Sequence, residues 1–210
     1  MSRDVVVLIH GIWMTSLELL LLGRRLQECG YECRYFRYPS LRRTPQQNAA
    51  RLRDYLQSIQ AAQVHLVAHS LGGIVLAHLF KQGAPPQPGR VVMLGTPLQG
   101  SVVARHLSKS RFTRWQLGRS IHNGLLGDAP QWHGVHESAM IAGSRPRGIG
   151  LLLAPGKLVR PHDGTVAVSE TRSAGLAHHL TLPHTHLSML FARDVAIQVC
   201  AFLQQGRFND

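Results

Sequence analysis

Residues 64–74 read V-H-L-V-A-H-S-L-G-G-I, an apolar run followed by a serine and two glycines. This pattern predicts a buried strand over 64–69, a sharp turn at Ser70 and a helix over 71–82. A serine hydroxyl is a weak nucleophile at neutral pH, so it needs an adjacent base, a tight turn and N–H groups that receive the developing oxyanion. The predicted turn makes Ser70 a candidate nucleophile. A buried helix start built of small residues is the alternative that the pattern leaves open.

Strands and helices alternate on both sides of this stretch. Apolar runs predict strands over 5–9 and 90–95, and a stretch rich in aromatic residues predicts another over 31–38. Helical spacing of leucines predicts a helix over 16–29, and Thr44-Pro45 opens another as N-cap and first helical residue. Steady alternation of this kind implies right-handed crossovers. The predicted fold class is therefore α/β, a doubly wound and mostly parallel sheet.

The alternation of predicted strands and helices is interrupted between residues 102 and 144, where the chain is basic, rich in glycine and carries Trp115 and Trp132. We expect this segment to be a cap or lid inserted into a single domain over 1–210. After it, the sequence predicts a buried strand over 149–154, a short strand over 178–182 and a closing helix over 187–203.

Length and composition fit one globular domain: 210 residues, 44% hydrophobic and 16% charged. No apolar run is long enough to span a bilayer, and the run after the first residues is too short for a signal peptide, so the predicted location is cytoplasmic. Cys29, Cys33 and Cys200 cannot all pair and lack metal-ligand spacing. We expect all three to be reduced packing residues.

The net charge of +12 comes almost entirely from arginine. The arginines are scattered and no binding motif accompanies them, so nucleic acid is not an expected partner. The densest basic run, residues 105–119, is also amphipathic. It is interpreted either as a solvated helix face or as a lid that makes weak contact with an anionic membrane surface.

A serine nucleophile requires a histidine base, and the histidine requires a carboxylate that holds its tautomer. When the serine sits at a strand-to-helix elbow, the acid and then the histidine follow it in the chain. Among the later carboxylates, Asp163 closely follows a predicted strand and lies in the turn sequence H-D-G-T-V. It is the predicted acid, with a simple turn-forming aspartate as the alternative. His184 and His186 both precede the closing helix, and His186, at its start, is the predicted base.

The oxyanion would be received by the backbone N–H of Leu71, which follows the serine, and by that of Ile12, after the first strand. Gly11 allows the backbone to turn inward, and His10 is expected to hydrogen-bond within this loop. A metal site is not expected, because no cysteine or carboxylate completes a ligand set around His184 and His186.

Five ordered motifs carry a resemblance to a known family: H-G-I-W at 10–13, A-H-S-L-G-G at 68–73, G-T-P-L-Q-G-S at 95–101, H-D-G-T-V at 162–166 and H-L-S-M-L at 186–190. Together they resemble the lipase and GPI-inositol-deacylase-like branch of the α/β-hydrolases, and Ala68 resembles the alanine variant of small bacterial lipases. The resemblance implies a compact α/β-hydrolase fold with a short cap. It also implies hydrolysis of a small-molecule or lipid carboxylic ester through an acyl-enzyme, without a cofactor.

Within that resemblance, Trp13, Trp115 and Trp132 are candidates to line the substrate pocket. The same triad of Ser70, Asp163 and His186 would also serve a thioesterase, an amidase or an acyltransferase. A non-catalytic binding protein of the same fold is the alternative from another class, although a binding protein has no physical need for all three side chains.

Overall fold

The computed structural model describes residues 4–83, 85, 88–133 and 136–209. A six-stranded sheet runs through the molecule in the order β2-β1-β3-β4-β5-β6, and every neighbouring pair of strands is parallel. The strands are β1 (Val5–Ile9), β2 (Glu32–Phe36), β3 (Val64–His69), β4 (Pro88–Leu94), β5 (Ser138–Gly143) and β6 (His178–Leu182). The predicted doubly wound sheet is confirmed, and it is parallel throughout.

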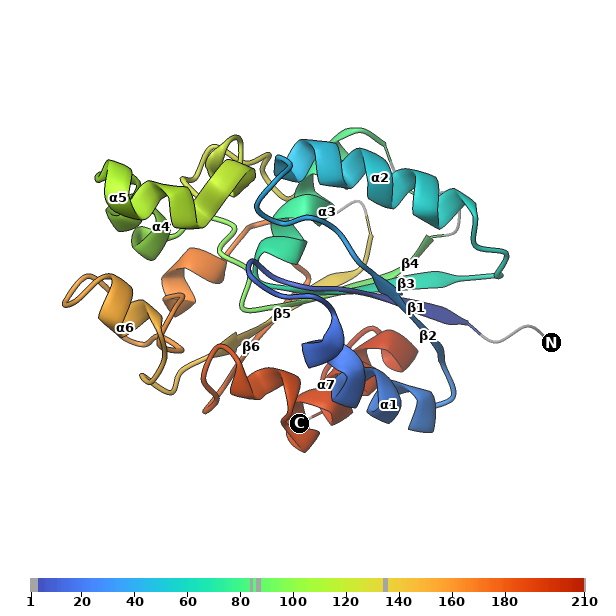
Figure 1. Cartoon of the computed structure of the whole chain (residues 1–210). Helices are drawn as coiled ribbons and strands as arrows, with labels where there is room; N and C mark the ends of the chain where they lie inside the picture. The colour runs from blue at the N-terminus through green and yellow to red at the C-terminus, as the bar shows by residue number, and fades with distance from the viewer. Residues whose placement is uncertain (1–3, 84, 86–87, 134–135, 210) are drawn as a thin grey trace.

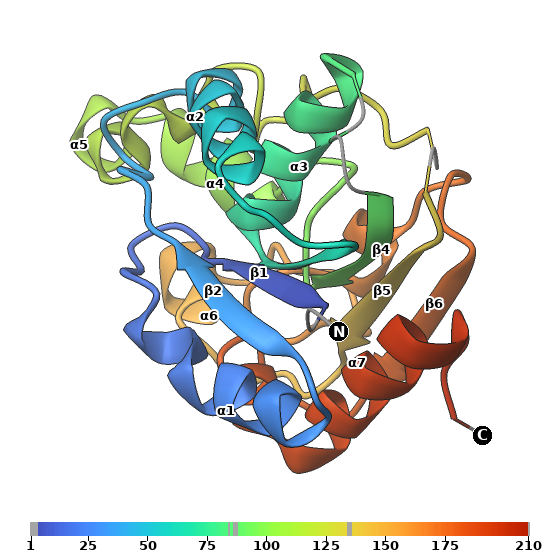
Figure 2. The same cartoon turned by 90° about the vertical axis from the view of Figure 1, so that its right-hand side faces the viewer.

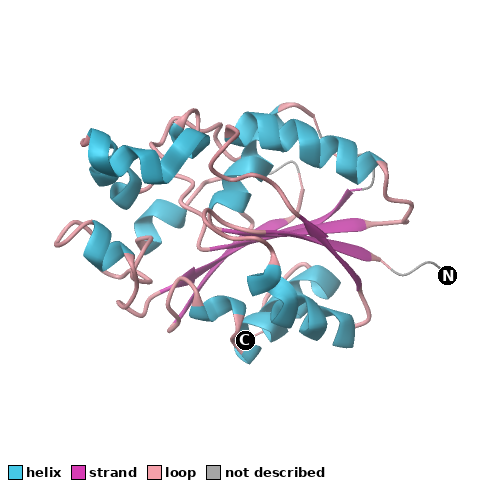
Figure 3. Cartoon of the chain, viewed as in Figure 1, coloured by secondary structure: helices cyan, strands magenta, loops and turns pink. Residues whose placement is uncertain are grey.

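Helices cover both faces of this sheet, which lies between two helical layers (Figure 3). The α-helices are α1 (Leu20–Glu28), α2 (Pro45–Gln57), α3 (Leu71–Lys81), α4 (Val102–Ser108), α5 (Arg111–Arg114), α6 (Gly150–Leu153) and α7 (Arg193–Gln205). Short 3₁₀ helices are η1 (Leu17–Leu19), η2 (Trp115–Ile121), η3 (Val168–Thr171) and η4 (Ser188–Leu190). None of the helices in the described ranges is long and apolar enough to cross a bilayer.

The two faces explain why β1 is apolar at every position rather than at alternate ones. On β1, Val5, Val7 and Ile9 pack in the core beneath α2 and α3, whereas Val6 and Leu8 pack in the core against α1 and α7. Figures 1 and 2 show α2 and α3 on one side of the sheet and α1 and α7 on the other. Successive side chains of a strand point to opposite faces, so both faces must be apolar when both are covered.

The strand order creates a switch point between β1 and β3, because the chain runs outward from β1 to β2 on one side and from β3 to β4 on the other. In open α/β sheets the ligand crevice lies outside the carboxyl ends of the strands at such a point. Here those ends lead into Gly11 and Ser70. The topology therefore brings the two segments of the predicted oxyanion site to one edge of the sheet.

One predicted strand is wrong. Residues 149–154 contain the short helix α6, and Leu152 is 82% exposed. The fifth strand is β5, whose six residues are all buried, and which lies inside the segment predicted to be a cap. The cap interpretation therefore applies to at most the part of the segment before β5. A short apolar run does not by itself distinguish a strand from a helix, and the leucine run was the more conspicuous of the two.

The prediction that all three cysteines are reduced is also wrong. Cys29 at the end of α1 and Cys200 in α7 form a disulfide, at a sequence separation of 171. The two helices pack against the same face of the sheet, so a pairing that spacing could not indicate follows from the topology. Cys33 is free, and burial raises the pKa of its thiol to about 12.

Candidate active site

Ser70 occupies a strained turn between β3 and α3. Its φ of 53° and ψ of −120° lie in a region that residues with side chains rarely adopt. The backbone amide of Ser70 donates a hydrogen bond of 2.9 Å to the carbonyl of Leu94, the last residue of β4. The turn therefore has the geometry expected for a nucleophile elbow, and its neighbours hold it in place.

Two glycines allow α3 to start close against the sheet. A Cβ on Gly72 would lie 2.7 Å from the carbonyl oxygen of Ile9, and a Cβ on Gly73 would lie 2.2 Å from the hydroxyl of Thr96. Real Cβ atoms do not approach other atoms this closely, so both positions exclude a side chain. A Cβ on Gly11 would likewise lie 3.1 Å from the Cβ of Ser70. The loop after β1 thus packs directly on the serine.

Asp163 and His186 form a hydrogen-bonded pair, with 2.6 Å between Asp163 Oδ2 and His186 Nδ1. Asp163 is 1% exposed, and its Oδ1 accepts hydrogen bonds from the amides of Thr165 (2.9 Å) and Val166 (2.7 Å). The amide of His186 also donates to the carbonyl of Asp163. A carboxylate that accepts from Nδ1–H leaves Nε2 of the imidazole as the basic nitrogen. This is the arrangement that a general base requires.

The end of β4 joins this pair to the serine. Leu94 accepts the hydrogen bond from Ser70, and at the next residue, Gly95, a Cβ would lie 3.0 Å from His186 Nδ1 and 3.3 Å from Asp163 Oδ2. Gly95 has a φ of 58°, so both its conformation and its surroundings favour glycine. The three residues predicted as a triad are therefore assembled around one short stretch of backbone.

His184 has a different partner. Its Nε2 lies 2.9 and 2.8 Å from the two carboxylate oxygens of Asp194, in the first turn of α7. Asp194 has 54% of its side chain exposed, whereas the Asp163 side chain is 1% exposed. His186 precedes η4, and α7 starts only at Arg193, so His186 is not at the start of the closing helix as predicted. The structure nevertheless pairs His186, and not His184, with the buried acid.

The loop that follows β1 is shaped by His10. The amide of Tyr38 donates to His10 Nε2 at 3.3 Å, so Nδ1 carries the proton and donates to the carbonyl of Gly11 at 2.8 Å. The Tyr38 hydroxyl donates to the His10 carbonyl at 2.7 Å, and the two rings stack at 4.2 Å. Burial lowers the pKa of His10, in keeping with this neutral form. The predicted role of His10 inside the loop is confirmed.

The two predicted oxyanion donors belong to the two segments that meet at Ser70, and their role stays a prediction. Leu71 is the first residue of α3, where an N–H has no partner within the helix. Ile12 follows Gly11 on the loop that packs against Ser70. Both N–H groups come from the carboxyl edge of the sheet, on either side of the switch point between β1 and β3.

His69 is a site residue that sequence reasoning did not identify. It is 2% exposed, its Nε2 lies 2.9 Å from the carbonyl of His186, and the two rings are 4.6 Å apart. Burial lowers the pKa of His69 well below its ordinary value, and the charge of His186 lowers it further. A neutral His69 donates from Nε2 to that carbonyl and so holds the backbone of His186. Its place before the serine was visible in the sequence, but its contact with His186 was not.

The three candidate pocket tryptophans are dispersed. Trp13 is 42% exposed beside the loop after β1, and its indole N–H donates to the carbonyl of Gln116 at 2.7 Å. Trp115 is 72% exposed. Trp132 is 4% exposed and donates to the hydroxyl of Ser138, the first residue of β5. Because the triad lies at the carboxyl ends of the strands, Trp132 belongs to the core at the opposite edge and does not line the triad.

The first helix of the cap segment is anchored to the loop that carries the acid. Glu170 accepts hydrogen bonds from the amides of Val102 and Ala167, and it lies 3.6 Å from the guanidinium of Arg105. Burial raises the pKa of Glu170. Helix α4 is thus bound to η3 through one carboxylate. Mobility of the remaining segment, from α5 to η2, stays a prediction.

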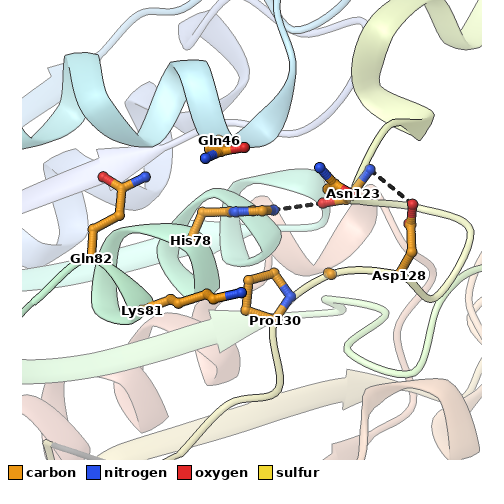
Figure 4. Close-up of a pocket in the computed structure, with 8 residues that line it drawn as sticks. Gln46, His78, Lys81, Gln82, Asn123, Asp128 and Pro130 are labelled. Atoms are coloured by element: carbon orange, nitrogen blue, oxygen red, sulfur yellow. Dashed lines mark hydrogen bonds between the residues drawn. The ribbon is translucent and has the colours of Figure 1, made fainter.

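A cavity of about 360 Å³ lies between α2, α3 and the loop around residue 123, and Figure 4 shows its lining. His78 contacts the carbonyl of Asn123 through Nε2, and Asp128 accepts hydrogen bonds from the amides of Asn123 and Gly124. The carboxylate of Asp128 therefore stabilises this loop and does not face the triad. Within the described ranges no group of three His, Cys, Asp or Glu residues is placed to hold a metal ion.

Comparisons with known proteins support the fold. A family model described as a domain of unknown function (DUF7379) matches residues 3–124. No curated protein matches the chain. The mature lipase BlEst2 of Bacillus licheniformis is similar in structure, with a TM-score of 0.78 and 20% identity over 99% of this chain and 93% of that one.

Two further solved structures have the same architecture. An extracellular alpha/beta-hydrolase from a Paenibacillus species has a TM-score of 0.63 and 16% identity, covering 99% of this chain and 100% of that one. The metagenomic carboxyl esterase MGS0156 has a TM-score of 0.61 and 14% identity, covering 90% and 66%. At these identities the likeness concerns the fold, and the fold is that of a compact α/β-hydrolase.

Proposed function

The chain belongs to the DUF7379 domain family, and from its geometry we propose that it is a serine hydrolase that cleaves carboxylic esters through an acyl-enzyme. One observation carries the proposal: the buried Asp163–His186 pair lies against Gly95, next to the residue that holds the strained turn of Ser70. A purely structural role requires neither a strained serine nor a buried, fully hydrogen-bonded carboxylate that orients a histidine.

In the proposed reaction, His186 Nε2 removes the proton of the Ser70 hydroxyl as the oxygen attacks the ester carbonyl. Asp163 holds the imidazole and stabilises the imidazolium that forms, without taking its proton. The N–H groups of Leu71 and Ile12 receive the oxyanion. The imidazolium then protonates the leaving alcohol, and a water activated by His186 releases the acid and regenerates the serine.

The similar structures include proteins described as a lipase and a carboxyl esterase, which supports ester hydrolysis as the class of reaction. Within the α/β-hydrolases, the five ordered motifs lead us to assign the chain to the lipase and GPI-inositol-deacylase-like branch. The substrate is then a small-molecule or lipid ester. Contact of the exposed basic segment around α5 with an anionic membrane surface, and a cytoplasmic location, belong to the same proposal.

A fluorophosphonate probe tests the nucleophile directly, because it labels only an activated serine. The folded wild-type chain should be labelled and Ser70→Ala should not, with matching melting temperatures showing that both are folded. Absence of labelling in the wild type would overturn the enzyme assignment. A panel of matched p-nitrophenyl esters, thioesters and anilides would then separate an esterase from a thioesterase or an amidase.

A further inference from the structure

A groove of about 560 Å³ outside the proposed triad is lined mainly by arginine. Its lining residues are Pro39, Arg42, Arg43, Gln47, Arg51 and Arg119. No carboxylate is among them. Its volume falls in the usual range for small-molecule sites, roughly 300–1,000 Å³.

The four guanidinium groups are available to a ligand. In the described part of the chain, the arginines that form ion pairs are Arg34, Arg90 and Arg105, and the guanidinium groups lining the groove have neither an ion pair nor a hydrogen bond. Four exposed like charges around one hollow repel one another, because none of them has an ion-pair partner among the described residues. An anion that enters the hollow removes this repulsion.

Backbone contacts give the groove its shape. The amides of Arg42 and Arg43 donate to the carbonyl of Pro39, and the amide of Arg119 donates to the carbonyl of Leu41 at 2.8 Å. At Gly118 the chain has a φ of 54°, and a Cβ would lie 2.3 Å from the Leu41 carbonyl oxygen, so only glycine permits this approach. These contacts place the segment after α5 against the loop before α2.

The start of α2 adds to the positive potential of the groove. Thr44 and Gln47 form a capping box, in which the Gln47 amide oxygen accepts from the Thr44 N–H and leaves the amide NH₂ as a donor. The first turn of α2 holds no acidic residue, although such residues are favoured there by the helix dipole. The groove therefore combines four guanidinium groups, an amide donor and the positive end of a 13-residue helix.

Shared residues and one hydrogen bond connect the groove to the loop after β1, which packs on Ser70. Pro39, which lines it, also lines a smaller cavity together with His10 and Tyr38, the residues that shape the oxyanion loop. On the other side, Trp13 donates to the carbonyl of Gln116, three residues before Arg119. Both connections lead to the carboxyl edge of the sheet, where Ser70 lies.

We propose that this groove binds a phosphate group, and that the phosphate is carried by the ester that Ser70 cleaves. Guanidinium groups bind phosphate oxygens through paired hydrogen bonds, and several of them around one hollow match a dianion better than a carboxylate. The second half of the proposal rests on the proposed hydrolase function. The first half does not, so the two are tested separately.

The binding test uses Ser70→Ala, which cannot turn over, and calorimetric titration with glycerol phosphate and inorganic phosphate at constant ionic strength. Sodium chloride replaces phosphate in the reference titration, so that general screening is matched. Arg51→Gln/Arg119→Gln, added to Ser70→Ala, should raise the dissociation constant of glycerol phosphate about tenfold or more. Arg24→Gln/Arg207→Gln removes two exposed charges outside the groove and should leave the dissociation constant unchanged.

The substrate test compares two esters of one acyl chain, one with a phosphate on the alcohol and one without. The ratio of their kcat/KM values should favour the phosphate ester in the wild-type chain. It should fall about tenfold in Arg51→Gln/Arg119→Gln, through KM, and stay constant in the control pair.

The outcomes separate the two claims. Equal weakening in both double variants, or no phosphate binding by Ser70→Ala, would overturn the site. Binding without any change in the ester ratio would assign the groove to free phosphate and overturn its role in substrate recognition. Tighter binding of a short single-stranded RNA than of glycerol phosphate would also overturn the role of the groove in substrate recognition. If the wild-type chain binds phosphate but hydrolyses neither ester, the proposed hydrolase function is refuted and the phosphate site is retained.

Discussion

Replacing Asp163 by asparagine should remove catalysis while leaving the fold almost unchanged. The Asp163 carboxylate accepts two backbone hydrogen bonds through Oδ1, from Thr165 at 2.9 Å and Val166 at 2.7 Å. An asparagine carbonyl can accept both. The amide NH₂ then replaces Oδ2, 2.6 Å from His186 Nδ1. Two donors cannot face each other, so the imidazole proton moves to Nε2 and the base is lost.

The two consequences differ greatly in size. Loss of the correct tautomer costs on the order of 10⁴ in kcat, which corresponds to about 5 kcal/mol of transition-state free energy. Exchange of one charge-assisted hydrogen bond for a neutral one lowers the free energy of unfolding by only about 1 kcal/mol. In a chain of this size that lowers Tm by about 2–4 °C.

The structure supplies a matched control in Asp194, the partner of His184. This pair has the same chemistry, but the Asp194 side chain is 54% exposed, so Asp194→Asn should lower stability by no more than about 1 kcal/mol. Its kcat should equal that of the wild type. The same contrast applies to the histidines: His186→Ala should be as damaging as Ser70→Ala, and His184→Ala should not.

The assay is hydrolysis of p-nitrophenyl acetate, with Tm measured on the same preparations. The reasoning is refuted if Asp163→Asn keeps more than about a tenth of wild-type kcat while folded. It is equally refuted if Asp194→Asn loses as much activity as Asp163→Asn.

Other predictions concern stability. In the described chain, burial is the main cause that lowers the pKa of seven histidines, most strongly that of His69, so the unfolded chain binds more protons below pH 6.5. The free energy of unfolding should therefore fall as the pH drops below 6.5, by up to about 1.4 kcal/mol per pH unit from His69 alone. Urea titrations at pH 7.5 and 5.5 measure this change, and a higher free energy of unfolding at pH 5.5 would contradict it. Trp132 is 4% exposed and Trp115 is 72% exposed, so Trp132→Ala should cost about 3–5 kcal/mol of stability and Trp115→Ala less than about 0.5 kcal/mol. Equal effects of the two substitutions on Tm would contradict this prediction. Replacing both Cys29 and Cys200 by serine should cost about 2–4 kcal/mol; Ellman titration of the unfolded wild-type chain should find one free thiol, Cys33, and three would show that the disulfide is absent.

Local sequence carried most of the fold. The apolar runs of β1, β3 and β4 and the Thr44-Pro45 helix start were predicted because each is specified by residues close together in the chain. Propensity and periodicity act over a few residues, so they can predict elements of this kind. They fail where two short apolar segments compete, as β5 and α6 did: the small residues of β5 form the buried strand, whereas the leucines of α6 form a short helix with Leu152 exposed.

The candidate site divides in the same way. Chain order and turn chemistry selected Ser70, Asp163 and His186, although the strand thought to precede Asp163 was the wrong one. The triad is a proposal still to be tested by activity. Its side chains could be predicted because a serine, an acid and a histidine follow one another along the chain in a recurring order. Three features could not be predicted, because each joins segments that only the packed structure brings together. They are the contact of His69 with His186, the pairing of His184 with Asp194 and the burial of Trp132.

The sequence by itself determined the alternation of elements, the strained serine turn and the candidate acid and base, because these depend on interactions between residues near one another along the chain. Only the tertiary structure decided which carboxylate each histidine meets, that Cys29 reaches Cys200, and that four arginines gather in one groove. The physical reason is that sheet order and helix packing set distances between residues far apart in the chain. Hydrogen bonds, disulfides and charge clusters depend on those distances and not on separation in sequence.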